Sequence, residues 1–128
     1  MKEIFIIGIV LLGIVCSSIF INNYLENTSK ILINDLKQLE NNIGQSDSSQ
    51  KELMEKSKEI YSKWGRINSK WSNIILHEEI DAIETSLIRI KEKIKIGKID
   101  ESIEDIETAI FLVNHIKEKE KISLKNIF

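Results

Sequence analysis

The chain has 128 residues and a net charge of -2, with 18 basic and 20 acidic side chains interleaved along its length. A chain of this size holds at most one modest domain beside a membrane span, and its mixed charges offer no basic face, so we expect no nucleic-acid binding. Proline is absent and glycine is scarce, whereas Ile, Leu, Glu and Lys are abundant, which predicts an all-α fold. The single cysteine, Cys16, excludes an intramolecular disulfide and a Cys-based zinc site.

The first predicted element is an apolar helix at the N-terminus. Residues 4–25 carry no charged side chain, and a helix of about 22 residues is roughly 33 Å long, enough to cross a hydrocarbon core about 30 Å thick. We therefore predict that residues 1–25 are a transmembrane anchor whose contact with membrane lipid is made by residues 4–25. The alternative is a cleaved signal peptide, but Ser17 and Ser18 offer a weak cleavage site because the apolar run continues beyond them.

The charges that flank this anchor predict its orientation. Lys2 and the terminal amine precede the apolar run, and Glu26 is the first charge after it. By the positive-inside rule, this distribution favours a cytoplasmic N-terminus. We expect a single-pass protein of the cell membrane, with residues 26–128 forming an extracytoplasmic domain in the periplasm or at the cell surface.

Apolar residues at alternating spacings of three and four predict helices throughout the extracytoplasmic part. The first continues outward from the anchor and ends at Gly44, where turn-forming residues follow. The second is a long central helix whose apolar stripe changes phase partway along, and a third helix and a short C-terminal turn follow it. The predicted bounds are about 26–43, 49–96 and 100–116 for the helices and 123–128 for the turn.

Short connections make successive helices antiparallel neighbours, so these elements are predicted to form a helical hairpin or three-helix domain around the long central helix. Counting outward from the first turn, the first helix is used up by Trp71, and the rest of the central helix pairs with the third. A straight central helix would then carry charged residues into the bilayer. We therefore expect either a bend near Asn22 and Asn23 or a break in the central helix around Gly65 or Asn73.

A polar cluster is predicted where the central and third helices pair. His77 shares a helical face with Asp81 and with Glu84, and counting from the turn places His115 level with Asp81. Together with Glu78, these imidazoles and carboxylates are ligands that suit zinc, the one cofactor that the chain suggests, and the histidines could also report pH. The simpler interpretation is that the carboxylates pair with histidine or lysine on the neighbouring helix and fix its register.

Three aromatic residues form a second candidate site. Trp64 and Trp71 lie a heptad apart, with Tyr61 one turn earlier. Large aromatic side chains are frequent anchors at interfaces, so these residues could form a docking face for a peptide, a glycan or a partner protein. The alternative is a core that needs bulky side chains where the first helix ends.

Taken together, these features resemble a family of short membrane-anchored helical proteins from Gram-positive anaerobes and spore formers, defined only as a domain of unknown function. The resemblance covers nearly the whole chain and implies a single anchored helical domain, but no activity. It directs attention to the tryptophans, His77, Asp81 and the C-terminus. Members often carry proline where Lys117 stands, which predicts a less sharp end to the third helix here. The matching stretches are Asn22 to Leu25, Trp64 with Trp71, His77 to Glu84, His115 to Glu120 and Leu124 to Phe128.

The sequence favours a non-enzymatic binding or accessory protein, anchored in the membrane and docking either an integral membrane protein or a second copy of itself as a homodimer. We expect no enzymatic activity, because the sequence carries no nucleophile elbow, phosphate-binding glycine loop or cysteine metal motif. The alternative is a metal- or pH-responsive envelope sensor that uses His77, Asp81 and His115.

Overall fold

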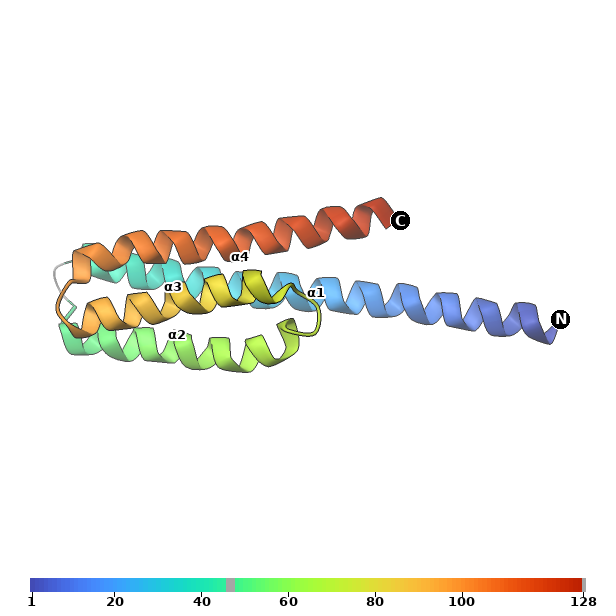
Figure 1. Cartoon of the computed structure of the whole chain (residues 1–128), viewed down its shortest axis with the longest axis horizontal. Helices are drawn as coiled ribbons and strands as arrows, with labels where there is room; N and C mark the ends of the chain where they lie inside the picture. Colours follow the sequence, from blue (N-terminus) through green and yellow to red (C-terminus); the bar gives the residue numbers. More distant parts are fainter. Residues whose placement is uncertain (46–47, 128) are drawn as a thin grey trace.

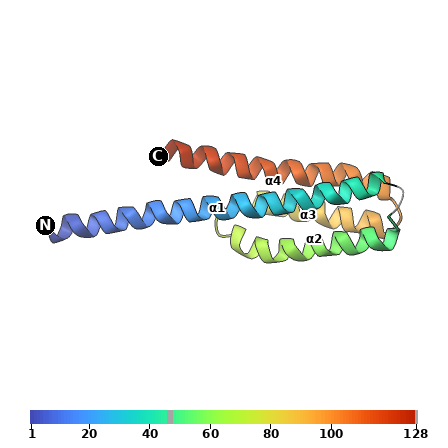
Figure 2. The same ribbon diagram turned by 180° about the vertical axis from the view of Figure 1, so that it is seen from behind.

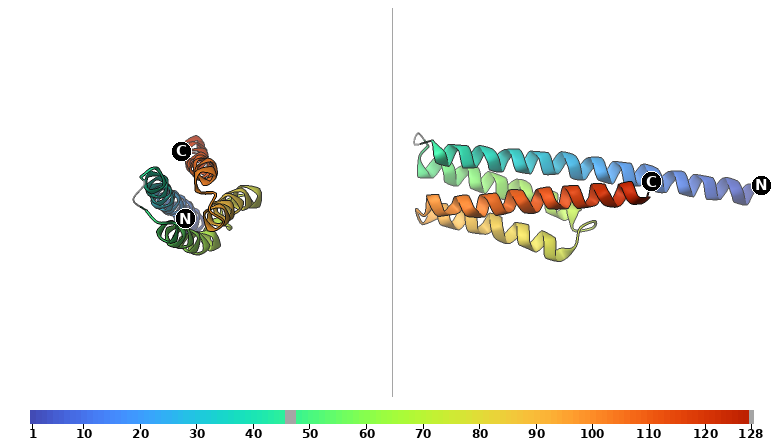
Figure 3. Two further views of the ribbon diagram at one scale, coloured as in Figure 1. Left: turned by 90° about the vertical axis from the view of Figure 1, so that its left-hand side faces the viewer. Right: turned by 90° about the horizontal axis from the view of Figure 1, so that it is seen from above.

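The computed structural model describes residues 1–45 and 48–127, with side chains as far as residue 122. Within this part the chain forms four helices and no strand, which confirms the predicted all-α class. Each helix packs against its neighbours in chain order, and the last also packs against the first, which closes an up-and-down four-helix bundle (Figures 1 and 3). The helices are α1 (Lys2–Gly44), α2 (Gln50–Trp71), α3 (His77–Lys95) and α4 (Ile99–Ile127).

The helix α1 is much longer than the bundle, and its N-terminal half projects from it as a single rod (Figure 1). No proline interrupts it, and Asn22 and Asn23 lie within the helix without a break. Polar side chains inside the rod bond to their own helix: Ser18 Oγ donates to the Ile14 carbonyl at 2.9 Å. The first buried residue is Leu25, so one continuous helix passes from an exposed apolar segment into the bundle core.

The bundle core is built from the apolar stripes that the spacing predicted. Trp64 and Trp71 are completely buried, and their rings meet edge to face with 5.8 Å between centroids. The aliphatic residues around them alternate at three and four along each helix, so every helix turns its apolar face inward. Representative members of the core are Leu32, Leu36, Leu39, Ile83, Ile90, Ile94, Ile106 and Val113.

The predicted long central helix over 49–96 is wrong, because the chain breaks between α2 and α3. The helix ends at Trp71, and the Ile74 and Ile75 amides both donate to the Trp71 carbonyl as the chain turns. Leu76 then takes an extended conformation and precedes α3. This break lies at Asn73, one of the places where the sequence predicted one. It lets Trp71 and Ile75 enter the core and explains the phase change, since both stripes face the same interior.

The predicted end of the last helix is also wrong. A helix over 100–116 and a separate turn over 123–128 were expected, whereas α4 continues without interruption to Ile127. The reason is local: the alternating Lys and Glu residues of 117–121 are good helix formers, and no glycine or proline intervenes. Residue 128, the last of the predicted turn, lies outside the described residues.

The predicted hairpin or three-helix arrangement becomes a four-helix bundle as a result of the break. The expectation that α1 is used up near Trp71 agrees with the contacts, because Trp71 Nε1 donates to Thr28 Oγ1 at 3.0 Å and Lys63 Nζ lies 2.7 Å from Asp35 Oδ2. The helix α1 packs not only against α2, its predicted partner, but also against α4, which runs antiparallel to it. At the far end, Gln50 Nε2 donates to the Ile94 carbonyl at 2.9 Å and ties α2 to the end of α3.

The turn after α3 depends on a glycine. Gly97 has a φ of 84°, and the Lys98 amide donates to the Lys93 carbonyl at 2.8 Å across it, which is a Schellman motif. Replacing Gly97 with alanine should lower the free energy of unfolding by about 1–2 kcal/mol, because a side chain disfavours this left-handed conformation. Gly65→Ala is the matched control: it lies inside α2 with open space beside it and should raise stability by about 0.5–1 kcal/mol. Urea unfolding of the full chain in detergent micelles measures both, and shifts of the same sign would contradict this assignment.

Candidate functional site

The most extensive candidate site is the exposed apolar surface of α1. Among the described residues, α1 is the one helix that is long and apolar enough to span a membrane, with an 18-residue window of mean hydropathy 3.0. None of that window is buried against the bundle. Ile4, Leu12 and Phe20 expose 76, 64 and 72% of their surface along the rod. Exposing so much apolar surface to water is unfavourable. Contact with lipid or with another protein would therefore stabilise this segment.

The predicted polar cluster lies on the surface of the bundle. His77 is the first residue of α3, where it is exposed together with Glu78 and Asp81, while Glu84 is half-buried and His115 is exposed on α4. The described residues contain no group of three or more His, Cys, Asp or Glu side chains placed to hold a metal ion. The zinc site and the sensor role therefore stay predictions.

The register of α3 and α4 explains the separation of the histidines. Glu79 Oε1 lies 2.9 Å from Lys119 Nζ, and Asp105 Oδ2 lies 2.6 Å from Lys93 Nζ. These pairs place His115 level with Ile83 rather than with Asp81, so that it is roughly 9 Å along the helix axis from the level of His77. Each histidine then has a different environment.

One of the two ion pairs that indicate this register joins Glu79 to Lys119, two side chains outside the predicted cluster. The Lys119 ammonium donates to Glu79, and this hydrogen bond together with the charge of Glu79 raises the pKa of Lys119 above its usual value. An ion pair between a carboxylate of α3 and a lysine of the neighbouring helix is the arrangement that the simpler interpretation of the polar cluster predicted. The carboxylate in this pair is Glu79, which was not among the predicted cluster residues.

The predicted aromatic site is divided between core and surface. Trp64 and Trp71 are inaccessible in the single chain, where their indoles fill the space between the helices. Tyr61 is half-buried at the surface, with Lys91 Nζ 4.2 Å from its ring centroid, a cation–π contact between α2 and α3. A docking role for the three together stays a prediction, and Tyr61 is the member that a partner could reach without opening the bundle.

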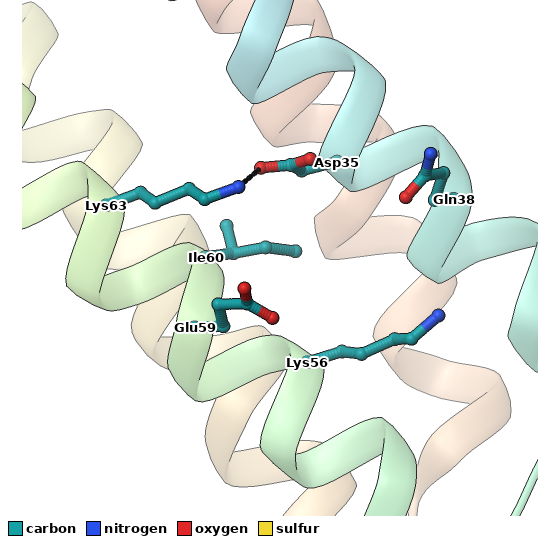
Figure 4. A pocket seen from close by; sticks show the side chains of 6 residues that line it. All are labelled: Asp35, Gln38, Lys56, Glu59, Ile60 and Lys63. Atoms are coloured by element: carbon teal, nitrogen blue, oxygen red, sulfur yellow. Dashed lines mark hydrogen bonds and ion pairs between the residues drawn. The ribbon is translucent and has the colours of Figure 1, made fainter.

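A groove between α1 and α2 encloses a cavity of about 160 Å³ (Figure 4). In it Lys63 points toward Asp35, and these two side chains form the 2.7 Å ion pair that joins the helices. Lys56 and Glu59 extend from the α2 side, so positive and negative side chains are equally represented. The groove thus binds α1 to α2 and concentrates no charge of one sign for a ligand.

A comparison with protein families identifies the chain. The model of a domain of unknown function, DUF4363, matches residues 19–127. The chain belongs to the DUF4363 family. This match confirms the resemblance to a domain of unknown function, and the DUF4363 domain begins within the apolar half of α1 and includes all four helices of the bundle. No curated protein and no solved structure matches the sequence.

The sequence interpretation missed several apolar residues that the DUF4363 domain exposes. Phe111 is 67% exposed on the outer face of α4, where its ring stacks on His115 with 6.0 Å between centroids. Leu76 and Ile122 are exposed by 63 and 58% at the end of the bundle near the rod, and Ile96 by 64% at the other end. A signal for Phe111 existed, because it lies out of phase with the inward stripe of α4, but a single aromatic residue is easily assigned to a core.

Proposed function

We propose that this protein is a non-enzymatic, single-pass membrane protein whose four-helix extracytoplasmic domain docks a protein partner next to the membrane. The observation that carries this proposal is the continuity of α1, which is an exposed apolar rod from Ile4 to Phe20 and a wall of the buried core from Leu25 onward. Monomeric soluble proteins rarely expose an apolar surface this large. A bilayer covers it fully, and the first core residue then lies just outside the hydrocarbon.

The flanking charges support the orientation with the N-terminus in the cytoplasm. Lys2, Glu3 and the terminal amine lie at the free end of the rod, so two basic groups and one acidic group stand there, whereas Glu26 follows the rod and pairs with Lys30 at 3.3 Å. The cytoplasmic side of a membrane protein is enriched in basic residues near the span. In this orientation the bundle, including the part of α1 from Leu25 onward, stands outside the membrane.

The proposed docking surface is the outer ridge of α4 around Phe111 and His115. These residues are one helical turn apart and stack with an interplanar angle of 16°, so that they present one continuous aromatic surface. An exposed aromatic pair offers a partner an anchor of large area and little conformational freedom. Because the anchor confines the bundle to the membrane, an integral membrane protein is the partner that meets this ridge at the highest local concentration.

A non-enzymatic role is supported by what the grooves contain. In the α1–α2 groove the basic and acidic side chains balance, and Lys63 is engaged with Asp35. The groove between α3 and α4 contains the carboxylates of Glu78 and Asp81 beside Arg89, but it is open to solvent. Catalysis would need a nucleophile or base held in an enclosed, polar site.

Site-specific photo-cross-linking in intact cells tests the docking surface. With a photoreactive phenylalanine analogue in place of Phe111, we expect one discrete cross-linked adduct. Its mass should differ from that of two copies of this chain. The matched control places the same analogue at Ser62, which is exposed on the outer face of α2 at a similar height in the bundle. Equal adducts from both positions, or none from position 111, would refute the α4 ridge as a docking surface, and an adduct of two chains would assign it to self-association.

A further inference from the structure

We propose that the end of the bundle nearest the rod is a second lipid contact, in which Leu76 and Ile122 enter the interfacial layer of the bilayer and fix the tilt of the four-helix domain. The inference rests on the proposed membrane anchoring of α1 and deepens it. It concerns a part of the domain that the anchor itself does not include.

The two residues are exposed at the same height on adjacent helices. Leu76 immediately precedes α3 and is 63% exposed, although its neighbour Ile75 is buried in the core. Ile122 is 58% exposed near the end of α4. The Glu79–Lys119 ion pair joins the two helices three residues after Leu76 and three before Ile122, so Leu76 and Ile122 are level across an antiparallel pair.

The contacts to α1 place this level at the outer end of the apolar rod. On one side, the hydrogen bond from Trp71 Nε1 to Thr28 Oγ1 holds the end of α2, and the turn to Leu76 continues from there toward the rod. On the other side, Lys121 lies with Asn22 and Leu25 around a small cavity of about 30 Å³. Leu76 and Ile122 are therefore about level with Leu25, the last residue of the uncharged run.

The helical arrangement agrees with this placement. The turn between α2 and α3 lies beside the part of α1 where the rod leaves the bundle, and α4 extends past that turn along the rod (Figures 1 and 2). The last turns of the α4 backbone therefore lie alongside the rod itself.

The residue types at this level are those of a membrane interface. Tyr24 is half-buried with its ring 5.3 Å from Lys70 Nζ, and Lys117 and Lys121 lie nearby on α4. Tyrosine and lysine are typical of the headgroup region, where an aliphatic side chain can enter the acyl boundary while an ammonium stays in water. The occupant that this surface fits is therefore the bilayer, which the anchor brings to it directly.

Environment-sensitive labels on the full chain in phospholipid vesicles test the proposal. In a Cys16→Ser background, Leu76→Cys and Ile96→Cys each carry one NBD fluorophore. The two positions are matched, since Leu76 and Ile96 are 63 and 64% exposed in the turns at either end of α3, but Ile96 lies at the end of the bundle away from the rod. We expect the label at 76 to emit at shorter wavelength and to be quenched several-fold more by lipids with a nitroxide near the headgroup, while iodide quenches the label at 96 more strongly.

A third label separates this proposal from the anchoring on which it rests. NBD on the native Cys16 should be quenched by nitroxides deep in the acyl chains, because Cys16 lies within the rod. If Cys16 is lipid-quenched while labels at Leu76→Cys and Ile122→Cys remain as accessible to iodide as the label at 96, the second contact is overturned and the anchor stands. If Cys16 itself is accessible to iodide, the anchor and the second contact both fall.

Discussion

Replacing Leu11 and Ile14 with arginine should release the protein from the membrane. Both side chains are more than half exposed near the middle of the rod, at 57 and 55%. On insertion scales, one arginine at the centre of a span raises the free energy of membrane insertion by about 2.5–3.5 kcal/mol. The two arginines together therefore raise it by roughly 5–7 kcal/mol above that of the native segment. The measurement is the share of the protein that stays in the membrane pellet after an alkaline wash.

The control for this variant places two arginines on the bundle. Ile31 and Phe111 are exposed by 48 and 67% outside the rod, so Ile31→Arg with Phe111→Arg adds the same charge without touching the proposed lipid contact of α1. We expect this protein to remain in the pellet. Equal retention of the two double variants would mean that something other than lipid covers the rod.

The second large effect is expected at the centre of the core. Trp71→Ala should lower the free energy of unfolding by about 3–5 kcal/mol, the usual cost of truncating a fully buried aromatic residue. The variant removes a completely buried ring, its edge-to-face contact with Trp64 and the hydrogen bond to Thr28. Since domains are stable by about 5–15 kcal/mol, this loss is a large fraction of the total. Urea unfolding of the full chain in micelles, followed by circular dichroism, measures it.

Tyr61→Ala is the companion to this substitution. Tyr61 is an aromatic residue of the same helix, but it is half-buried at the surface against Lys91. Its truncation should cost clearly less than that of Trp71, because less apolar surface returns to water and no enclosed cavity is left. Equal losses in the free energy of unfolding from Tyr61→Ala and Trp71→Ala would show that the Trp71 side chain is not enclosed by the bundle.

Much of the bundle follows from the spacing of its apolar residues. The stripes containing Leu36, Trp64 and Ile90 were readable from the sequence because a helix in a bundle must bury one face. The break after Trp71 was harder to place. Ser72 and Asn73 disfavour a helix interior only weakly, so local preference did not decide between a break at Gly65 and one at Asn73. The turn at Asn73 is the one that brings both halves of the stripe to one core.

The candidate site was less predictable for a geometrical reason. Same-helix relations such as His77 with Asp81 follow directly from helical periodicity. The relation to His115 requires the register between two helices, and an error of two or three residues in counting around a turn moves a side chain by about 3–5 Å along the axis. Phe111 shows a further limit: its position outside the inward stripe of α4 predicts exposure, but its stacking on His115 becomes visible only in the structure.

Because α1 passes without interruption from the rod into the bundle, the proposed membrane anchoring would also fix how the bundle is rotated about the axis of α1. Each helical residue advances about 1.5 Å and turns about 100°. One residue inserted between Asn23 and Leu25 would leave the height of the bundle almost unchanged but would rotate all its outer faces by more than a quarter turn about the anchor. The number of helical residues between the exposed rod, which ends near Phe20, and the first core residue, Leu25, therefore sets the direction in which the proposed docking surface on α4 faces about the axis of α1.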